Sequence, residues 1–134
     1  MIGDLYSIDN YTRRFITDNP YDIFVFGDNM ERRGMGGQAK ECRGLVNTVG
    51  IPTKWRPGSD PADFFKDSDF NFVSSVILGD FVKLTIYRQQ GFNVWWPSAG
   101  VGTGLSRLPE KAPKIYEYIQ FQYQELKKGI TSEY

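Results

Sequence analysis

The sequence predicts one α/β domain, with helices on the faces of a mostly parallel sheet. Short β-branched and aromatic segments alternate along the chain with segments of helical periodicity. The chain has 134 residues, enough for one well-buried core, and no shift in composition marks a domain boundary. Glycine clusters follow two of the strand-like segments, which is where ligands bind in such sheets.

In the first part of the chain we expect a strand, a short helix and a second strand. Residues 1–8 are the candidate first strand, and residues 11–17 form a short helix. Pro20 ends this helix, because a proline disfavours helical backbone in the residue before it. Residues 23–26 are β-branched and aromatic without polar alternation, which is typical of a buried central strand.

The rest of the chain continues this alternation. A short helix is predicted over residues 38–45 and a brief strand over residues 49–53. Apolar residues at spacings of three and four predict a long helix over residues 70–90. A strand over residues 92–96 follows, and the last helix begins at Pro109. The loops after parallel strands meet at one edge of the sheet, so we expect both glycine clusters there.

The composition excludes several kinds of catalytic site. The chain has no histidine, which excludes a Ser-His-Asp triad, a Cys-His pair and any zinc site with a histidine ligand. Its one cysteine, Cys42, cannot form an all-thiolate metal site, and we expect it to be buried and unreactive. No dinucleotide-binding or P-loop motif is present, so we expect neither a metal nor a cofactor.

We expect a monomer located in the cytoplasm. Lys plus Arg and Asp plus Glu both number 16, and this balance disfavours binding along a nucleic-acid backbone. Nucleic acid would then enter only as a modified substrate. A single cysteine forms no internal disulfide, which favours a reducing compartment. The sequence has no signal-peptide pattern and no apolar run long enough for a membrane span.

The first segment with chemical potential runs from residue 26 to residue 38. Gly34, Gly36 and Gly37 precede a predicted helix, where backbone N–H groups can face an anion and the helix dipole adds attraction. Asp28 and Asn29 stand at the end of the preceding strand, where polar side chains can reach a ligand. The alternative for this segment alone is an ordinary tight turn.

The second segment, residues 97–108, has glycines at alternate positions. Gly100, Gly102 and Gly104 with small hydroxyl residues between them suit a nest of inward-pointing amides around a phosphate. A flexible surface loop is the alternative. Two such loops after two strands favour a clamp around a diphosphate.

A third segment, residues 50–57, has two equally supported interpretations. Lys54 and Arg56 can meet an anion while Trp55 stacks on a base or ribose. Alternatively the turn is solvated and Trp55 packs at the edge of the core. Trp95 and Trp96 are adjacent in a predicted strand, so they should pack into the core on opposite faces of the sheet.

These segments together resemble the macrodomain superfamily, and they look closest to the small macrodomain-like proteins of bacteria and phages. The resemblance covers residues 21–125 and rests on the order of its parts. These are Ile23 to Asn29, Gly34 to Ala39, Pro97 to Leu105, and the Leu108-Pro109-Glu110-Lys111-Ala112 run that opens the last helix. Within the superfamily, the second glycine segment is most similar to the group that removes terminal ADP-ribose from proteins or DNA bases.

The resemblance implies a three-layer α/β/α fold with a mixed, mostly parallel central sheet, and ADP-ribose or a related nucleotide as ligand. The diphosphate would lie between residues 34–38 and 99–105, and Asn29 would contact the distal ribose. Asp18 and Asp22 are the candidates for reading adenine. The residues expected to contact the ligand are Gly27, Gly34, Gly36, Gly37, Gln38, Thr53, Lys54, Trp55, Ser98, Gly100, Val101, Gly102, Thr103, Gly104 and Leu105.

Two functions follow from this resemblance. The first is hydrolysis of an ADP-ribosyl linkage on protein or nucleic acid, by an ADP-ribosyl glycohydrolase-like enzyme. Asp28 would be the catalytic base or orient water there, and Asn29 would hold the ribose. The second is a non-catalytic reader or sponge for ADP-ribose, because Gln38 and Ser106 stand where hydrolytic members carry acidic residues. A structural protein whose loops are only turns is a third hypothesis.

Overall fold

The computed structural model describes residues 1–132. Four strands and five helices of this part alternate along the chain, with two short 3₁₀ turns before the longest helix. In chain order the elements are β1 (Leu5–Ile8), α1 (Arg13–Asp18), β2 (Ile23–Asp28), α2 (Ala39–Cys42), β3 (Thr48–Pro52), η1 (Pro61–Asp63), η2 (Asp67–Asp69), α3 (Phe70–Gln89), β4 (Val94–Pro97), α4 (Leu108–Lys111) and α5 (Pro113–Lys127).

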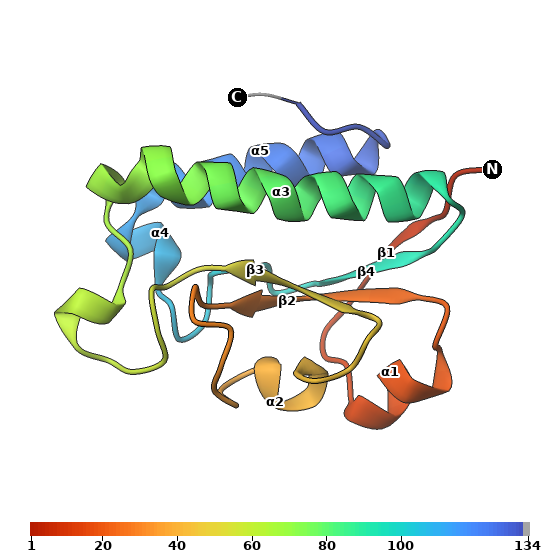
Figure 1. Cartoon of the computed structure of the whole chain (residues 1–134), viewed down its shortest axis with the longest axis horizontal. Coiled ribbons are helices and arrows are strands. Elements are labelled where there is room, and N and C mark those ends of the chain that lie inside the picture. The colour runs from red at the N-terminus through yellow and green to blue at the C-terminus, as the bar shows by residue number, and fades with distance from the viewer. Residues whose placement is uncertain (133–134) are drawn as a thin grey trace.

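The strands form one sheet in the order β1-β4-β2-β3, and every pair of neighbours is parallel. Val94 of β4 is level with Leu5 of β1 on one side and with Ile23 of β2 on the other. On the far side of β2, Val25 pairs with Val49 of β3. The predicted α/β class with a mostly parallel sheet is therefore confirmed, and the carboxyl ends of all four strands meet at one edge (Figure 1).

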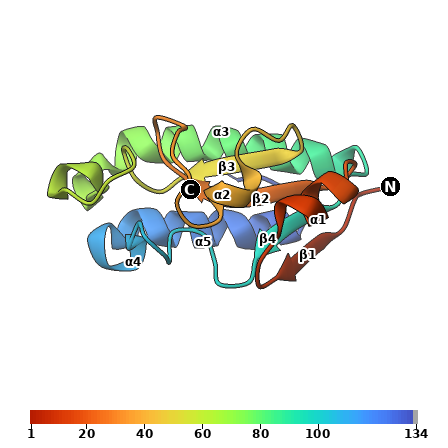
Figure 2. The same cartoon turned by 90° about the horizontal axis from the view of Figure 1, so that it is seen from below.

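Helices cover both faces of the sheet, which gives three layers. Helices α3 and α5 lie side by side on one face, and α1 and α2 lie on the other (Figures 1 and 2). Because both faces are covered, residues 23–26 of β2 are all buried, as their lack of polar alternation predicted.

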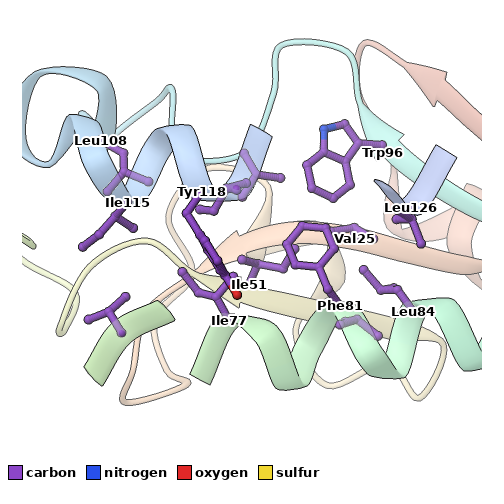
Figure 3. Packing of buried hydrophobic residues seen from close by; sticks show 14 of the residues in the cluster. Val25, Ile51, Ile77, Phe81, Leu84, Trp96, Leu108, Ile115, Tyr118 and Leu126 are labelled. Carbon is purple, nitrogen blue, oxygen red and sulfur yellow. The ribbon is translucent and has the colours of Figure 1, made fainter. Parts of the chain in front are cut away.

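Two hydrophobic clusters fill the spaces between the layers. The larger lies between the sheet and the α3–α5 pair, and it includes Val25, Phe81 and Trp96 (Figure 3). The smaller lies towards α1 and α2, and Trp95 packs against it. The two adjacent tryptophans therefore contact opposite clusters, as their alternation in a strand predicted. Cys42 is buried in the smaller cluster, and burial raises the pKa of its thiol to about 12.

Two predicted helices differ from the observed ones for local reasons. Helix α2 spans residues 39–42 rather than 38–45, because Arg43 already has extended backbone with a ψ of 134° and Gly44 follows it at a φ of +86°. The predicted last helix is two helices, α4 and α5. Ala112, at φ −147°, separates them because Pro113 follows it.

Helix α3 contributes one face to the core and leaves the other exposed. Val73, Ile77, Phe81 and Leu84 are fully buried against the sheet and α5. By length and composition alone the segment Asp67–Gln89 could cross a membrane, with 33% of its most apolar stretch buried. Core helices of proteins without a membrane-spanning segment meet the same criterion.

Candidate functional site

A cleft of about 810 Å³ lies at the carboxyl edge of the sheet. Residues that follow each of the four strands line it, as the parallel arrangement predicts. We call residues 29–38, between β2 and α2, the first glycine loop, and residues 98–107, between β4 and α4, the second glycine loop. Both contribute to the lining, so the two glycine clusters do meet.

Most of the residues predicted for the site line this cleft. Asp28 and Asn29 do so at the end of β2. The other predicted residues in the lining are Gly27, Gly34, Gly36, Gly37, Gln38, Thr53, Lys54, Gly100, Gly102, Thr103, Gly104 and Leu105. A β-carbon added to Gly27 would lie 3.8 Å from the Gly102 nitrogen and 3.8 Å from Thr53 Oγ1, so three strand ends converge at this point.

Trp55, Ser98 and Val101 are the predicted ligand residues that do not line the cleft. Val101 is 1% exposed and belongs to the large core cluster. The Ser98 hydroxyl donates to Asp9 Oδ1 at 2.5 Å.

Trp55 packs at the edge of the core, as in the second interpretation of its segment. Its ring stacks on Phe72 at 6.1 Å and meets the edge of Phe65 at 5.0 Å. Its indole Nε1 donates to Asp69 at 3.2 Å. The sequence could not show this, because Phe72 lies on a helix that begins fifteen residues after Trp55.

The second glycine loop presents unoccupied backbone donors. Gly100 and Gly102 have φ of +92° and +91°, in the left-handed region that favours glycine. A β-carbon on Gly102 would also lie 2.8 Å from Leu108 Cδ2. Within the described residues, the N–H groups of residues 101–106 donate no hydrogen bond. A run of unpaired amides beside a cleft can accept an anion.

The helix that follows the first glycine loop adds little to anion binding. This helix, α2, has four residues, which is too short for a substantial dipole. The N–H groups of Ala39 and Lys40 already donate to the carbonyls of Gly36 and Gly37 at 3.2 and 3.3 Å. Within the described residues, the N–H groups of residues 33–38 donate no hydrogen bond, so this loop, like the second, has backbone donors available to a ligand.

The side chains of Asp28 and Asn29 are both buried but differ in their partners. Asp28 Oδ1 accepts from Arg43 Nη2 at 2.5 Å and from the Asn29 N–H at 2.8 Å, and Arg32 Nη1 lies 3.7 Å from Oδ2. Asn29 Nδ2 donates to the Arg33 carbonyl at 2.7 Å. Asn29 Oδ1 is buried and has no partner among the described residues. A buried acceptor without a hydrogen bond lowers the stability of the folded state, so a donor is expected to bind to it.

A family model described as a family of unknown function, DUF7831, matches residues 6–122. The chain belongs to this family. No curated protein and no solved structure matches it. The matched residues include the whole lining of the cleft, from Asp9 to Ser106.

The cleft of this DUF7831 member also contains residues that sequence reasoning missed. Asp9 to Thr12 line it after β1, and the Gln38 amide donates to the Tyr11 carbonyl at 2.9 Å. The signal was available, because these residues follow a candidate strand as the glycine loops do. Ser106 lines the cleft and is buried.

The two candidates for reading adenine lie outside the cleft lining. Asp18 ends α1, where its carboxylate is 3.6 Å from Arg14 Nε. Asp22 precedes β2, and its Oδ2 accepts from Trp95 Nε1 at 2.8 Å. It therefore stands at the amino end of the strand, opposite the edge that forms the cleft.

A smaller cavity of about 330 Å³ borders Asp28 as well. Arg32, Arg43, Asp80 and Lys83 also line it. Burial raises the pKa of the Asp80 carboxyl, and the nearby Arg32 guanidinium partly opposes this rise. Within residues 1–132, no three His, Cys, Asp or Glu side chains gather in a way that could hold a metal ion.

Proposed function

We propose that the cleft binds ADP-ribose or a related nucleotide, with the diphosphate on the second glycine loop. The run of unpaired N–H groups over residues 101–106 carries this proposal. Fixed amides bind phosphate oxygens without the desolvation of a charged side chain, and alternate glycines let the backbone approach them closely. The resemblance to macrodomains, stated from sequence, supports the same ligand.

Other features of the cleft fit a ligand of this kind. Its volume of about 810 Å³ lies within the range of about 300–1,000 Å³ that small-molecule sites occupy. Asn29 Oδ1 needs a hydrogen-bond donor, and a ribose hydroxyl is one. Arg33, Lys40 and Lys54 bring cationic side chains to the lining, which also contains the carboxylates of Asp9, Asp28 and Glu41.

Binding without hydrolysis is the function that the geometry supports best. A general base must be able to take a proton from water or substrate within hydrogen-bond distance. The side chain of Asp28 is 3% exposed, and Arg43 Nη2 and the Asn29 N–H both donate to its Oδ1. This carboxylate is therefore held as an ion-pair partner. Gln38 and Ser106, at the other two places expected to be acidic, carry no charge.

Hydrolysis of an ADP-ribosyl linkage is the second candidate. Asp28 and Asn29 border the same cleft as the glycine loops, which favours this reaction. A ligand that displaced Arg43 would free the Asp28 carboxylate to orient water.

Titration calorimetry with ADP-ribose tests the binding proposal. We expect ADP-ribose to bind, ADP to bind more weakly, and inorganic phosphate to bind weakly or not at all. Gly102→Ala should weaken ADP-ribose binding by about tenfold or more, because a β-carbon strains the backbone at φ +91° and meets Leu108. Gly79→Ala on α3 is the matched control, because a β-carbon there meets nothing within 4 Å.

The absence of ADP-ribose binding to folded wild-type protein would overturn the proposal. Circular dichroism melting of each variant distinguishes a damaged loop from a damaged fold.

A release assay on ADP-ribosylated protein and DNA separates the two candidates. Binding without release favours the reader or sponge. If release occurs, Asp28→Ala should slow it by about two to four decades if Asp28 is the base. Turnover unchanged in Asp28→Ala would remove Asp28 from the catalytic role.

A further inference from the structure

The side chain of Arg43 joins Asp28 to the first glycine loop. Arg43 directly follows α2, and its side chain is 19% exposed. Its Nη2 donates to Asp28 Oδ1 at 2.5 Å and its Nη1 to Asp28 Oδ2 at 3.4 Å, a two-pronged contact. The same guanidinium donates from Nε to the Gly34 carbonyl at 2.6 Å and from Nη2 to the Arg33 carbonyl at 3.2 Å.

Asp28 is itself anchored to the sheet and to α3. Its Oδ2 lies 3.7 Å from Arg32 Nη1, and Arg32 Nη2 lies 3.3 Å from Asp80 Oδ2 on α3. A β-carbon on Gly50 of β3 would lie 2.5 Å from Asp28 Oδ2, so glycine there leaves room for the carboxylate. The partner of Arg43 is therefore held by Arg32 and packs closely against Gly50.

The first glycine loop has no regular structure of its own. Residues 29–38 form neither a strand nor a helix. Near the start of the loop, the Met30 N–H donates to the Lys54 carbonyl at 2.9 Å. At its end, the Gln38 side-chain amide donates to the Tyr11 carbonyl at 2.9 Å. Between these two points Arg43 contacts the carbonyls of Arg33 and Gly34. Asn29 Nδ2 also donates to the Arg33 carbonyl, and the Arg32 guanidinium donates to the Gly50 carbonyl and to Asp80, whereas the Gly34 carbonyl accepts from Arg43 alone among the described residues.

We propose that Arg43 is a positioning residue that holds the middle of the first glycine loop in the shape that binds the ligand, with Asp28 as its anchor. This inference rests on the proposed function. Arg33 and Gly34, whose carbonyls accept from Arg43, both line the cleft, so their release would move its wall. A lysine cannot substitute, because its ammonium is a point charge without the planar fork that reaches several acceptors.

Backbone ¹⁵N relaxation of the ligand-free protein tests the positioning directly. In wild type, Gly34 and Gly36 should have order parameters close to that of a rigid backbone, about 0.85. In Arg43→Met and in Arg43→Lys these values should fall below about 0.6, while residues of β2 keep theirs. Arg14→Met is the matched control, because Arg14 is a 92% exposed arginine on α1, outside the cleft.

Several results of the relaxation experiment would overturn the positioning role of Arg43. One is a wild-type loop whose order parameters are already below about 0.6. Another is a loop that stays rigid in Arg43→Met. A third is a fall in order parameters spread equally over the loop and β2, which would show general support of the fold. Wild-type values in Arg43→Lys would show that charge suffices and would refute the role of the fork.

Titration with ADP-ribose completes the test. Both Arg43 variants should bind on the order of tenfold to a hundredfold more weakly than wild type, the effect of losing hydrogen bonds from a charged group. Arg14→Met should bind as wild type does. Unchanged affinity in Arg43→Met would overturn the positioning role. Failure of wild type itself to bind ADP-ribose would refute the proposed function, and the relaxation data would still decide whether Arg43 orders the loop.

Discussion

Gly36 of the first glycine loop lies against Leu105 of the second. A β-carbon added to Gly36 would be only 3.1 Å from Leu105 Cδ1. Both residues line the cleft, and Leu105 is nevertheless 69% exposed. The two loops thus touch across the cleft through a side chain that has little else to pack against, which leaves its apolar surface free to cover a bound ligand.

Leu105→Ala should weaken ADP-ribose binding without affecting the fold. Loss of an apolar contact of this size corresponds to about fivefold in affinity. The free energy of unfolding should stay within about 0.5 kcal/mol of wild type, since the side chain is exposed. Val46→Ala is the control, because Val46 is 98% exposed and lies outside the cleft lining. Equal affinity in the two variants would contradict a role for Leu105.

Gly50→Ala should destabilise the protein by about 1–3 kcal/mol, as overpacking does. The added β-carbon would lie 2.5 Å from Asp28 Oδ2 and 2.8 Å from Asp28 Cβ, so β3 or the carboxylate must move. Urea denaturation measures the change. If stability were unaltered, the Asp28 side chain would have to move without cost. This would contradict its close hydrogen bond with Arg43.

Gly79→Ala should stabilise the protein, in contrast to Gly50→Ala. Gly79 lies inside α3, where a β-carbon meets nothing within 4 Å. Alanine favours helix over glycine by about 0.5–1 kcal/mol, and the variant should be stabilised by that amount. The same urea experiment detects it. Destabilisation would indicate that the exposed face of α3 is covered in solution.

Arg88→Met should destabilise the protein by about 1–3 kcal/mol, because it leaves the buried Gly3 carbonyl without a donor. Arg88 is 7% exposed, and its guanidinium donates to Gly3 at 2.8 Å and to Leu126 at the end of α5. Methionine retains much of the apolar stem. Arg14→Met, which removes an exposed arginine, should change stability by less than about 0.5 kcal/mol.

Asp80 should make stability depend on pH. Burial raises the pKa of its carboxyl above the ordinary value of 3.8, so the folded state holds its proton more tightly than the unfolded state does. This stabilising contribution is complete below pH 3.8 and is lost as the pH rises through the raised pKa. The stability that wild type has over Asp80→Asn, measured as the difference in their free energies of unfolding, should therefore decrease as the pH rises above 3.8. A difference that is constant or increases would contradict this sign.

Local sequence features predicted the secondary structure better than the order of the strands. The run over residues 23–26 indicated a buried strand, because each side chain faces a covered side of the sheet. The alternation of strands and helices predicted parallel pairing, but the strand order depends on contacts such as Leu5 with Val94, which no local pattern encodes. The shortness of α2 was missed because the backbone already leaves the helical region at Arg43, a residue type that favours helix.

At the site, the glycine loops could be predicted from the sequence, but the tertiary contacts that hold them could not. Gly34, Gly100 and Gly102 take positive φ, a local property of the residue. The ion pair of Asp28 with Arg43 is a tertiary contact, which no local pattern encodes. The ligand and any reaction remain predictions.

The pairing of β1 with β4 has a consequence for biosynthesis. β1 is the first strand to be made, yet its neighbour in the sheet is the last strand. Because chains emerge from the ribosome amino end first, β1 stays unpaired until residues 94–97 are available. Asp9, which follows β1, reaches the cleft only then. A nascent chain therefore has no complete cleft until most of the protein has been synthesised, and closing so long a separation slows folding.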